Sequence, residues 1–223
     1  MEIRRIVDLS VVVDAETQVY PGDPRPALRQ ATRLETEGFN VLSLSLGSHS
    51  GTHVDAPYHV LTDGARLDEL DLGLFAGRGV IADVTHRSPR QPIAWGDLEP
   101  VARRLGPGAI LVLRTGWSEE HLGTARYYDH PFLDPDACLR ILELGVRTIA
   151  IDALNPDPTV LDGEPDLPVH RLVLGAGGAI AENLTNLSSV GDVEPLVCLF
   201  PIRLGGAADG APCRAVALDL SPD

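Results

Sequence analysis

Glycine and proline are spread along the whole chain, and this feature constrains the fold more than any other. The 223 residues include 22 Gly and 18 Pro, and neither type gathers in a linker or a low-complexity tract. Proline removes a backbone donor and fixes φ, while glycine favours turns. The pattern therefore predicts many turns between short elements. With no segment long enough to separate two units, we predict a single domain over residues 1–223.

Short apolar runs between these turns have the length of β-strands. The predicted strands cover residues 6–13, 41–46, 79–84, 109–114, 148–151, 196–202 and 215–220. In the second of these, apolar residues alternate with serine, which predicts a half-buried strand with Leu42, Leu44 and Leu46 directed into the core.

One helix has clear sequence signals at both ends. Asp134 followed by Pro135 is typical of an N-cap and a first helical position, and Gly145 is typical of a helix end. Because predicted strands outnumber helices, the predicted fold class is mixed α/β with a substantial antiparallel component.

The charge of the chain limits its partners. Acidic residues outnumber basic ones 32 to 18, and the net charge is −14. Nucleic acids and anionic membranes both need a positive surface, so we expect neither as a partner. Residues 1–13 lack the long apolar segment of a signal peptide, and no apolar run approaches the roughly 18 residues of a spanning helix. We therefore expect a cytoplasmic protein.

Two residue types exclude further classes of chemistry. All 18 basic residues are arginine, which excludes a Schiff-base lysine and a phosphate-loop lysine. Cys138, Cys198 and Cys213 are widely separated in the sequence, a pattern that describes neither a disulfide framework nor a thiolate zinc site. We expect all three to be buried apolar residues.

Histidines gather in the segment SHSGTHVDAPYHV. His49, His53, Asp55 and His59 all have odd numbers. In extended backbone alternate side chains share one face, so the numbering places these four side chains together. A helix would also bring the first two histidines together, although the intervening glycine and the following proline disfavour it.

These residue types indicate a metal site. Imidazole nitrogen and carboxylate oxygen are ligands that zinc and manganese accept. His49, His53 and Asp55 would supply most of a coordination shell within seven residues, and His59 is a candidate for the acid/base group that a catalytic site needs. The alternative is a group of solvated loop histidines.

The stretch 49–59 reads H-x-G-T-H-x-D-x-P-x-H and resembles the signature of the cyclase family, which includes arylformamidases and isatin hydrolases. Similar segments recur along the chain: DLS at 8–10, VYPGDP at 19–24, LRTGW at 113–117, AIDALNPDP at 150–158, H-x11-E-N-L-x-N-L at 170–187 and DGAPCRAVA at 209–217. The resemblance implies a layered β/β/α sandwich of the swivelling-domain kind, with a mixed, partly antiparallel sheet. It also implies a homodimer or homotetramer.

The resemblance further implies two divalent metal ions per chain, with zinc preferred and manganese as the alternative. His49, His53 and Asp55 would bind one ion. His170 would bind the second, with Asp55 and Glu182 shared between the two. The spacing of residues alone does not join His170 and Glu182 to the first cluster.

The implied activity is hydrolysis of a small amide by a metal-activated water, with His59 as general acid and base. The expected reaction is that of an arylformamidase, from N-formylkynurenine to kynurenine and formate. A cyclic amide or lactone hydrolase of the isatin hydrolase type is the alternative, and a non-catalytic metal-binding module is a third reading. Where the family has a substrate-contacting tryptophan before PGD, this chain has Tyr20, which either contacts the substrate or packs the loop.

Overall fold

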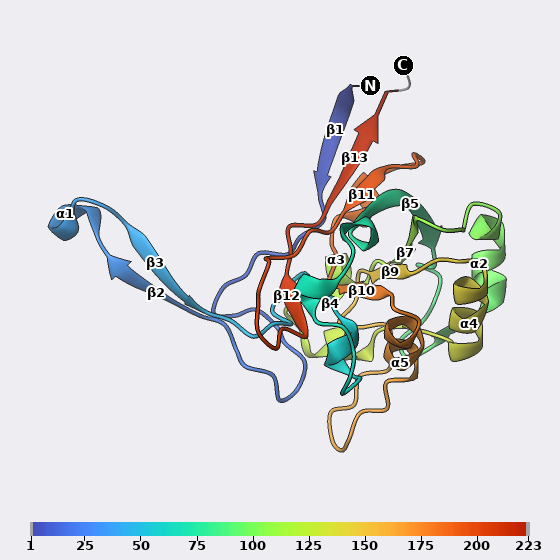
Figure 1. Ribbon diagram of the computed structural model, residues 1–223, viewed down its shortest axis with the longest axis horizontal. Helices are drawn as coiled ribbons and strands as arrows, with labels where there is room; N and C mark the ends of the chain where they lie inside the picture. Colours follow the sequence, from blue (N-terminus) through green and yellow to red (C-terminus); the bar gives the residue numbers. More distant parts are fainter. Residues whose placement is uncertain (1, 222–223) are drawn as a thin grey trace.

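A nine-stranded mixed sheet organises the computed structural model, which describes residues 2–221 (Figure 1). In order across the sheet its strands are β1 (Ile3–Asp8), β13 (Val216–Leu220), β11 (Leu196–Cys198), β5 (Ala76–Asp83), β7 (Ala109–Arg114), β9 (Thr148–Ile151), β10 (Ala179–Glu182), β4 (His53–Asp55) and β12 (Gly210–Pro212). The four strands from β5 to β10 are parallel, and the pairings on both sides of them are antiparallel. The sheet is therefore mixed, as predicted.

Few helices accompany this sheet. The α-helices are α1 (Leu34–Glu37), α2 (Trp95–Ala102), α3 (Trp117–His121), α4 (Pro135–Glu143) and α5 (Pro168–Gly175). The 3-10 turns are η1 (Pro57–His59), η2 (Leu67–Glu69), η3 (Leu72–Leu74), η4 (Ala125–Asp129) and η5 (Leu187–Ser189). Helices α2, α4 and α5 lie together on one side of the parallel strands (Figure 1). Among residues 2–221 no helix is long and apolar enough to cross a membrane.

Two small sheets complete the structure. One joins β6 (Pro92–Ile93) to β8 (Phe132–Leu133). The other joins β2 (Ala27–Thr32) to β3 (Val41–Ser45) as a hairpin that projects away from the rest of the molecule (Figure 1).

The central strands are buried on both faces. In β7, Leu111 and Leu113 belong to the hydrophobic cluster that includes the helices, whereas Ile110 and Val112 belong to a second cluster on the opposite face. A parallel strand covered on both faces needs a continuous apolar run rather than an alternating one. The run AILVL therefore fits this position.

Several sequence predictions are confirmed. The mixed α/β class is observed, and the strands predicted at 109–114 and 148–151 have those bounds. The Asp134 side chain accepts hydrogen bonds from the amides of Asp136 and Ala137 at the start of α4, and Gly145 follows the helix with φ +91°. The strand predicted at 6–13 is displaced, because it begins at Ile3 and its pairing ends at Asp8. The strand predicted at 196–202 is shorter than expected, because its regular pairing ends at Cys198.

The prediction of a half-buried strand at 41–46 is wrong about burial. The strand β3 forms, but all five of its residues are exposed, with Leu42 at 49% and Leu44 at 57%. Alternation identified the strand correctly, yet it carries no information on what covers the apolar face. Here β3 pairs with β2 alone, outside the main sheet.

The N-cap of α4 gives a test of the fold. We expect Asp134→Ala to lower the free energy of unfolding by about 1 kcal/mol, because two amides of the first turn lose their acceptor. Chemical denaturation measures the change, and Glu143→Ala on the same helix is the control. Equal stability of the Asp134→Ala and control proteins would contradict the capping role.

Candidate metal centre

The structure brings five predicted site residues together from separate parts of the chain. His53 and Asp55 lie on β4, and His49 lies in the turn before it. Strand β10 pairs with β4 so that Glu182 lies opposite His53. His170 comes from α5, which packs against β10.

Two histidines and two carboxylates form the buried centre of this group. His53 Nε2 lies 3.3 Å from Asp55 Oδ1 and 3.2 Å from Glu182 Oε2. His170 Nε2 lies 3.1 Å from Glu182 Oε1 and 3.6 Å from Asp55 Oδ2. All four residues are buried. Ligand atoms from β4, β10 and α5 therefore converge on one small volume.

Three of the converging atoms have no hydrogen-bond partner. His53 Nε2, Asp55 Oδ2 and Glu182 Oε1 are buried, and none of them forms a hydrogen bond with any residue from 2 to 221. A buried polar atom without a partner costs about 1–3 kcal/mol. A divalent cation would satisfy imidazole and carboxylate lone pairs together. The residues present therefore fit a metal ion.

Hydrogen bonds on the far side of each ring fix how the two central histidines are presented. His53 Nδ1 lies 2.8 Å from the Gly51 carbonyl oxygen, and His170 Nδ1 lies 2.7 Å from Asp157 Oδ2. With Nδ1–H donating to these acceptors, each Nε2 presents its lone pair to the centre. Asp157 also accepts from the backbone amides of Val169 and His170, so it holds the start of α5.

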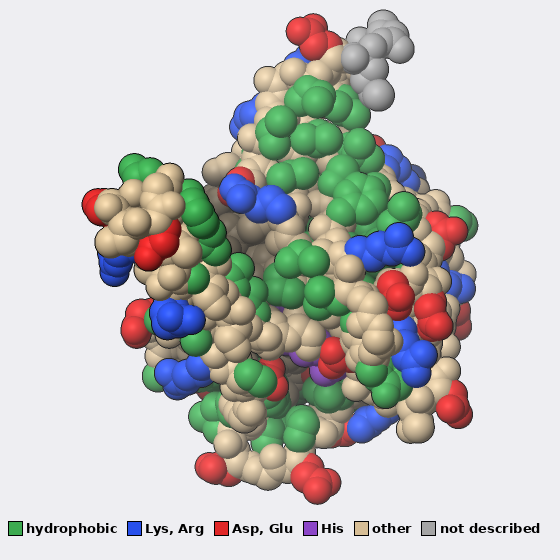
Figure 2. Space-filling view, turned by 60° about the vertical axis from the view of Figure 1, so that its left-hand side comes forward, with side chains coloured by type: hydrophobic (Ala, Val, Ile, Leu, Met, Phe, Trp, Pro, Cys, Tyr) green, Lys and Arg blue, Asp and Glu red, His purple; other side chains and the backbone are tan. Residues whose placement is uncertain are grey.

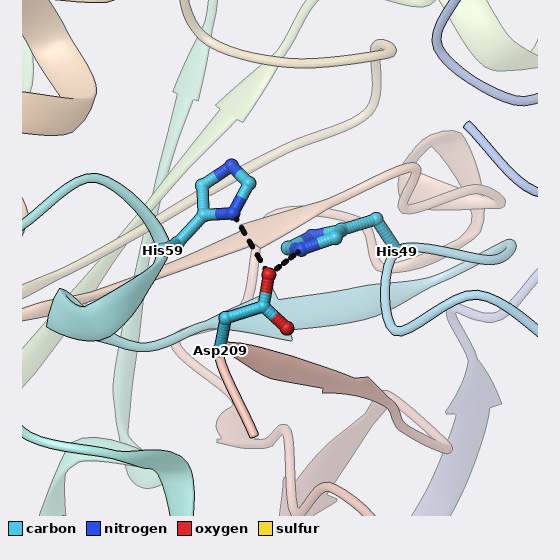
Figure 3. Close-up of side chains that lie close together, drawn as sticks. All are labelled: His49, His59 and Asp209. Atoms are coloured by element: carbon cyan, nitrogen blue, oxygen red, sulfur yellow. Dashed lines mark hydrogen bonds and ion pairs between the residues drawn. The ribbon is translucent and has the colours of Figure 1, made fainter. Parts of the chain in front are cut away.

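A second group lies at the edge of the centre (Figure 3). Asp209 Oδ2 is 3.0 Å from His49 Nε2 and 3.2 Å from His59 Nδ1. The other ring nitrogen of His49 is 2.8 Å from Asp55 Oδ1. His49 therefore links the buried centre to Asp209, and the same carboxylate contacts His59.

The electrostatics of the centre favour cations. Burial acts to lower the pKa of His49, but hydrogen bonds to Asp209 and Asp55 raise it to about 9. Burial likewise acts to lower the pKa of His53, but the nearby carboxylates of Asp55 and Glu182 raise it to about 10. Burial and the charge of Asp55 act to raise the pKa of Glu182, but His170 and His53 hold it below its usual range. The carboxylates are thus ionised at neutral pH.

The centre opens into a cavity of about 310 Å³. Its polar wall includes His49, His53, His59, His170 and Glu182, and its apolar wall includes Leu154, Val160, Leu161, Pro165 and Leu167. Tyr20 lines the cavity too, and its hydroxyl oxygen accepts a hydrogen bond from the Val160 amide at 3.2 Å. Tyr20 therefore lines the cavity and holds the backbone of Val160, another residue of the lining.

Sequence reasoning missed three carboxylates around this site. Asp157 and Asp209 hold histidines, and Asp23 lines the cavity, where burial raises its pKa. Each lies within a segment that the family resemblance covers, but only the fold brings it to a histidine or to the cavity. No spacing rule within one segment could have assigned them.

The chain is similar to known proteins over most of its length. The family model Cyclase, described as "Putative cyclase", matches residues 7–158. A kynurenine formamidase of Geobacillus thermodenitrificans is 31% identical and covers 94% of this chain and 95% of its own length. A kynurenine formamidase of Salinibacter ruber is 34% identical and covers 98% and 99%. An isatin hydrolase bound to the product analogue thioisatinate has the same fold, with a TM-score of 0.87, 22% identity and coverage of 97% of this chain and 92% of that one.

The raised pKa values of His49 and His53 predict how metal binding depends on pH. A histidine must lose its proton before it coordinates a metal, so binding at pH 7 should release protons. We expect the apparent zinc affinity of the metal-free protein to rise from pH 6 to about 9. Calorimetric titration in two buffers of different ionisation enthalpy measures the released protons. A pH-independent affinity over this range would contradict the prediction.

Proposed function

The chain belongs to the cyclase family, and from this premise we propose that it is a metal-dependent hydrolase of a small amide. The proposed reaction is that of an arylformamidase, which converts N-formylkynurenine to kynurenine and formate. The observation that carries the proposal is the convergence of buried, unpaired ligand atoms of His53, Asp55 and Glu182 beside a cavity that His59 also lines.

The proposed metal ligands form two groups that share two carboxylates. His49, His53 and Asp55 would hold one ion, and Asp55, His170 and Glu182 would hold the other, with Glu182 shared as well. Support comes from the ligand atoms, which lie within 4.8 Å of one another in each group of three. We propose two divalent ions, zinc or alternatively manganese, because nitrogen and carboxylate ligands suit both. When bound, such ions acidify a water and polarise the amide carbonyl.

His59 is the proposed general acid and base. Its Nδ1 is bound to Asp209, which leaves Nε2 to exchange protons with a molecule in the cavity. Burial acts to raise the pKa of Asp209, but hydrogen bonds with His49 and His59 hold it well below its usual range, so this carboxylate stays ionised. In hydrolysis His59 would accept a proton from the attacking water and return it to the leaving nitrogen.

The residues that line the cavity favour an aromatic substrate. Leucine, valine and proline side chains line the same cavity as the histidines, and Tyr20 adds an aromatic surface. An aryl amide is also a favourable substrate chemically, because an aromatic amine is a less basic leaving group. The third reading, a non-catalytic binding module, is disfavoured because the proposed ligands and the acid/base group are all present.

The relatives favour the formamidase over the isatin hydrolase alternative. Proteins that are 31% and 34% identical over nearly the whole chain are kynurenine formamidases, whereas the likeness to isatin hydrolase is one of fold. A single domain over residues 1–223, a cytoplasmic location and a homodimer or homotetramer belong to the same proposal.

Turnover tests the proposed function. We expect the metal-loaded protein to hydrolyse N-formylkynurenine with either zinc or manganese, and chelation to abolish the activity. His59→Ala should lower kcat by roughly 10²–10⁴-fold at unchanged metal content, because the proton relay is lost. His86→Ala, at an exposed surface histidine, is the control.

Metal-loaded protein that leaves N-formylkynurenine intact would overturn the substrate assignment. Turnover of isatin by that same protein would support the cyclic amide alternative. Full activity of His59→Ala would overturn the role of His59 without affecting the proposed ligands.

Asp209 gives a separate test of how His59 is positioned. We expect Asp209→Asn to lower kcat by about 10–100-fold with little change in KM, because the His59 ring loses the carboxylate that orients it. Metal content is measured in parallel, because Asp209 also contacts His49. A wild-type kcat would remove Asp209 from the mechanism.

A further inference from the structure

A second cavity lies beside the one into which the buried metal centre opens. We call it the side cavity; its volume is about 260 Å³, and its lining includes His49, His59, Asp209, Asp23 and Ser50. Histidine side chains, in purple, are visible from outside in a recess of the molecule, with acidic side chains beside them (Figure 2). The proposed hydrolysis takes place in the first cavity, which leaves the side cavity without a role.

Three ligand atoms at the side cavity have the spacing of a zinc site (Figure 3). Asp209 Oδ2 lies 3.0 Å from His49 Nε2 and 3.2 Å from His59 Nδ1. The three residues offer ligand atoms that all lie within 4.8 Å of one another. With zinc bonds of about 2.0–2.1 Å, two ligand atoms of a tetrahedral ion lie roughly 3.3 Å apart. The observed distances are close to this separation, so an ion fits with small movements of the side chains.

A buried hydroxyl without a partner is a fourth polar group at the side cavity. Ser50 is 0% exposed, and its Oγ forms no hydrogen bond with any residue from 2 to 221. Buried polar atoms are ordinarily bonded to protein, to water or to an ion. Because Ser50 lines the side cavity, its hydroxyl is available to a ligand that enters there.

Exposure and charge also favour a cation from solution. The side chains of His49, His59 and Asp209 are 15%, 26% and 33% exposed, whereas the four residues of the buried centre are covered. Asp23 adds a second carboxylate to the lining, and no arginine from residues 2–221 lines this cavity. Water weakens electrostatic attraction at such an exposed site, so an ion there would bind less tightly than at the buried centre.

We propose that the side cavity binds a further divalent ion, zinc, through His49, His59 and Asp209, with Ser50 as the fourth group. Two imidazole ligands favour zinc over magnesium, which prefers oxygen ligands. The ion would replace the protons that now bridge Asp209 to the two rings. It would bind at higher free zinc than the ions of the buried centre.

His49 connects the two metal sites. Its Nδ1 lies 2.8 Å from Asp55 Oδ1 in the buried centre, and its Nε2 faces Asp209. A neutral imidazole has one lone pair, so His49 serves one ion at a time. The buried ion that loses His49 would keep His53 and the two shared carboxylates. The side cavity therefore fills without emptying the buried centre.

An ion in the side cavity would inhibit the proposed hydrolysis. It would occupy Nδ1 of His59 and also the Asp209 carboxylate that orients this ring. A coordinated imidazole keeps the proton on its other nitrogen, so His59 would no longer accept a proton from the attacking water. Excess zinc would thus block the protein that a smaller amount activates. This inhibition rests on the proposed function, whereas binding of the further ion does not.

Equilibrium dialysis against zinc tests the site without any substrate. We expect wild-type protein to bind one ion more, at higher free zinc, than its tightly bound ions. Asp209→Asn and, separately, Ser50→Ala should each raise the dissociation constant of this further ion at least about 10-fold, while the tight ions stay bound. Asp136→Asn, which removes an exposed carboxylate on α4, is the matched control. Circular dichroism confirms that each variant is folded.

Cobalt(II) tests where the further ion lies. Ser50→Cys replaces the unpartnered hydroxyl by a thiol, whose thiolate form is a strong ligand for zinc and cobalt. We expect the weakly bound cobalt, and not the tightly bound cobalt, to produce thiolate-to-metal charge-transfer absorption in this variant. Wild-type protein is the control, because it contains the same Cys138, Cys198 and Cys213. Absorption that saturates with the tight ions, or its absence, would overturn the assigned position.

Initial rates over a series of zinc concentrations test the inhibition. We expect turnover of N-formylkynurenine to rise as the tight ions bind and to fall as the side cavity fills, at the free zinc that dialysis gives for the further ion. In Ser50→Ala the fall should need about 10-fold more zinc. Excess magnesium should cause no fall.

The outcomes separate the site from the reaction. Dialysis that finds no ion beyond the tight ones, or a further ion bound equally well by Asp209→Asn, would overturn the site. A further ion that leaves turnover unchanged would overturn its inhibitory role. Protein that binds the further ion as expected but has no turnover at any zinc concentration would support the site and contradict the proposed function.

Discussion

The antiparallel ladder between β4 and β10 is the interaction on which the site depends. It puts Glu182 opposite His53, and α5, which packs on β10, brings His170 to the same place. On its other side β4 pairs with β12, so Gly210 lies opposite Asp55. A Cβ at Gly210 would come within 2.6 Å of the Val54 carbonyl oxygen, which leaves glycine as the residue that fits this close approach. Asp209, the residue before it, thereby reaches His49 and His59.

Burial makes this arrangement costly and also gives it its chemistry. Taking carboxylates such as Asp55 and Glu182 out of water costs several kcal/mol per ion unless opposite charges repay it. In the metal-free protein His53 and His170 repay it as cations, which is why burial fails to lower their pKa. Protons and a metal ion would therefore compete for the same ring nitrogens. The tethers at Gly51 and Asp157 hold the rings in place whichever cation is bound.

The sequence predicts the elements that neighbouring residues determine. Contacts between residues far apart in the sequence appear only in the fold. Strand 109–114 and the cap at Asp134 follow from neighbouring residues, and the structure has both. The cluster from His49 to His59 is likewise visible because one short segment contains it. Glu182 enters only through the family resemblance, since no local pattern marks a carboxylate that meets its partners across a ladder. Asp209 was missed for the same reason, because its contacts to two histidines depend on where β12 pairs.

The exposed strand β3 shows the same limit in a different form. The alternating leucines of β3 predict a strand that faces a core, and the strand forms without that core. Leu42 and Leu44 are 49% and 57% exposed, because β3 pairs with β2 alone and neither strand joins the main sheet. Periodicity thus predicts that a strand has an apolar face, and only the tertiary pairing decides whether a core lies against that face.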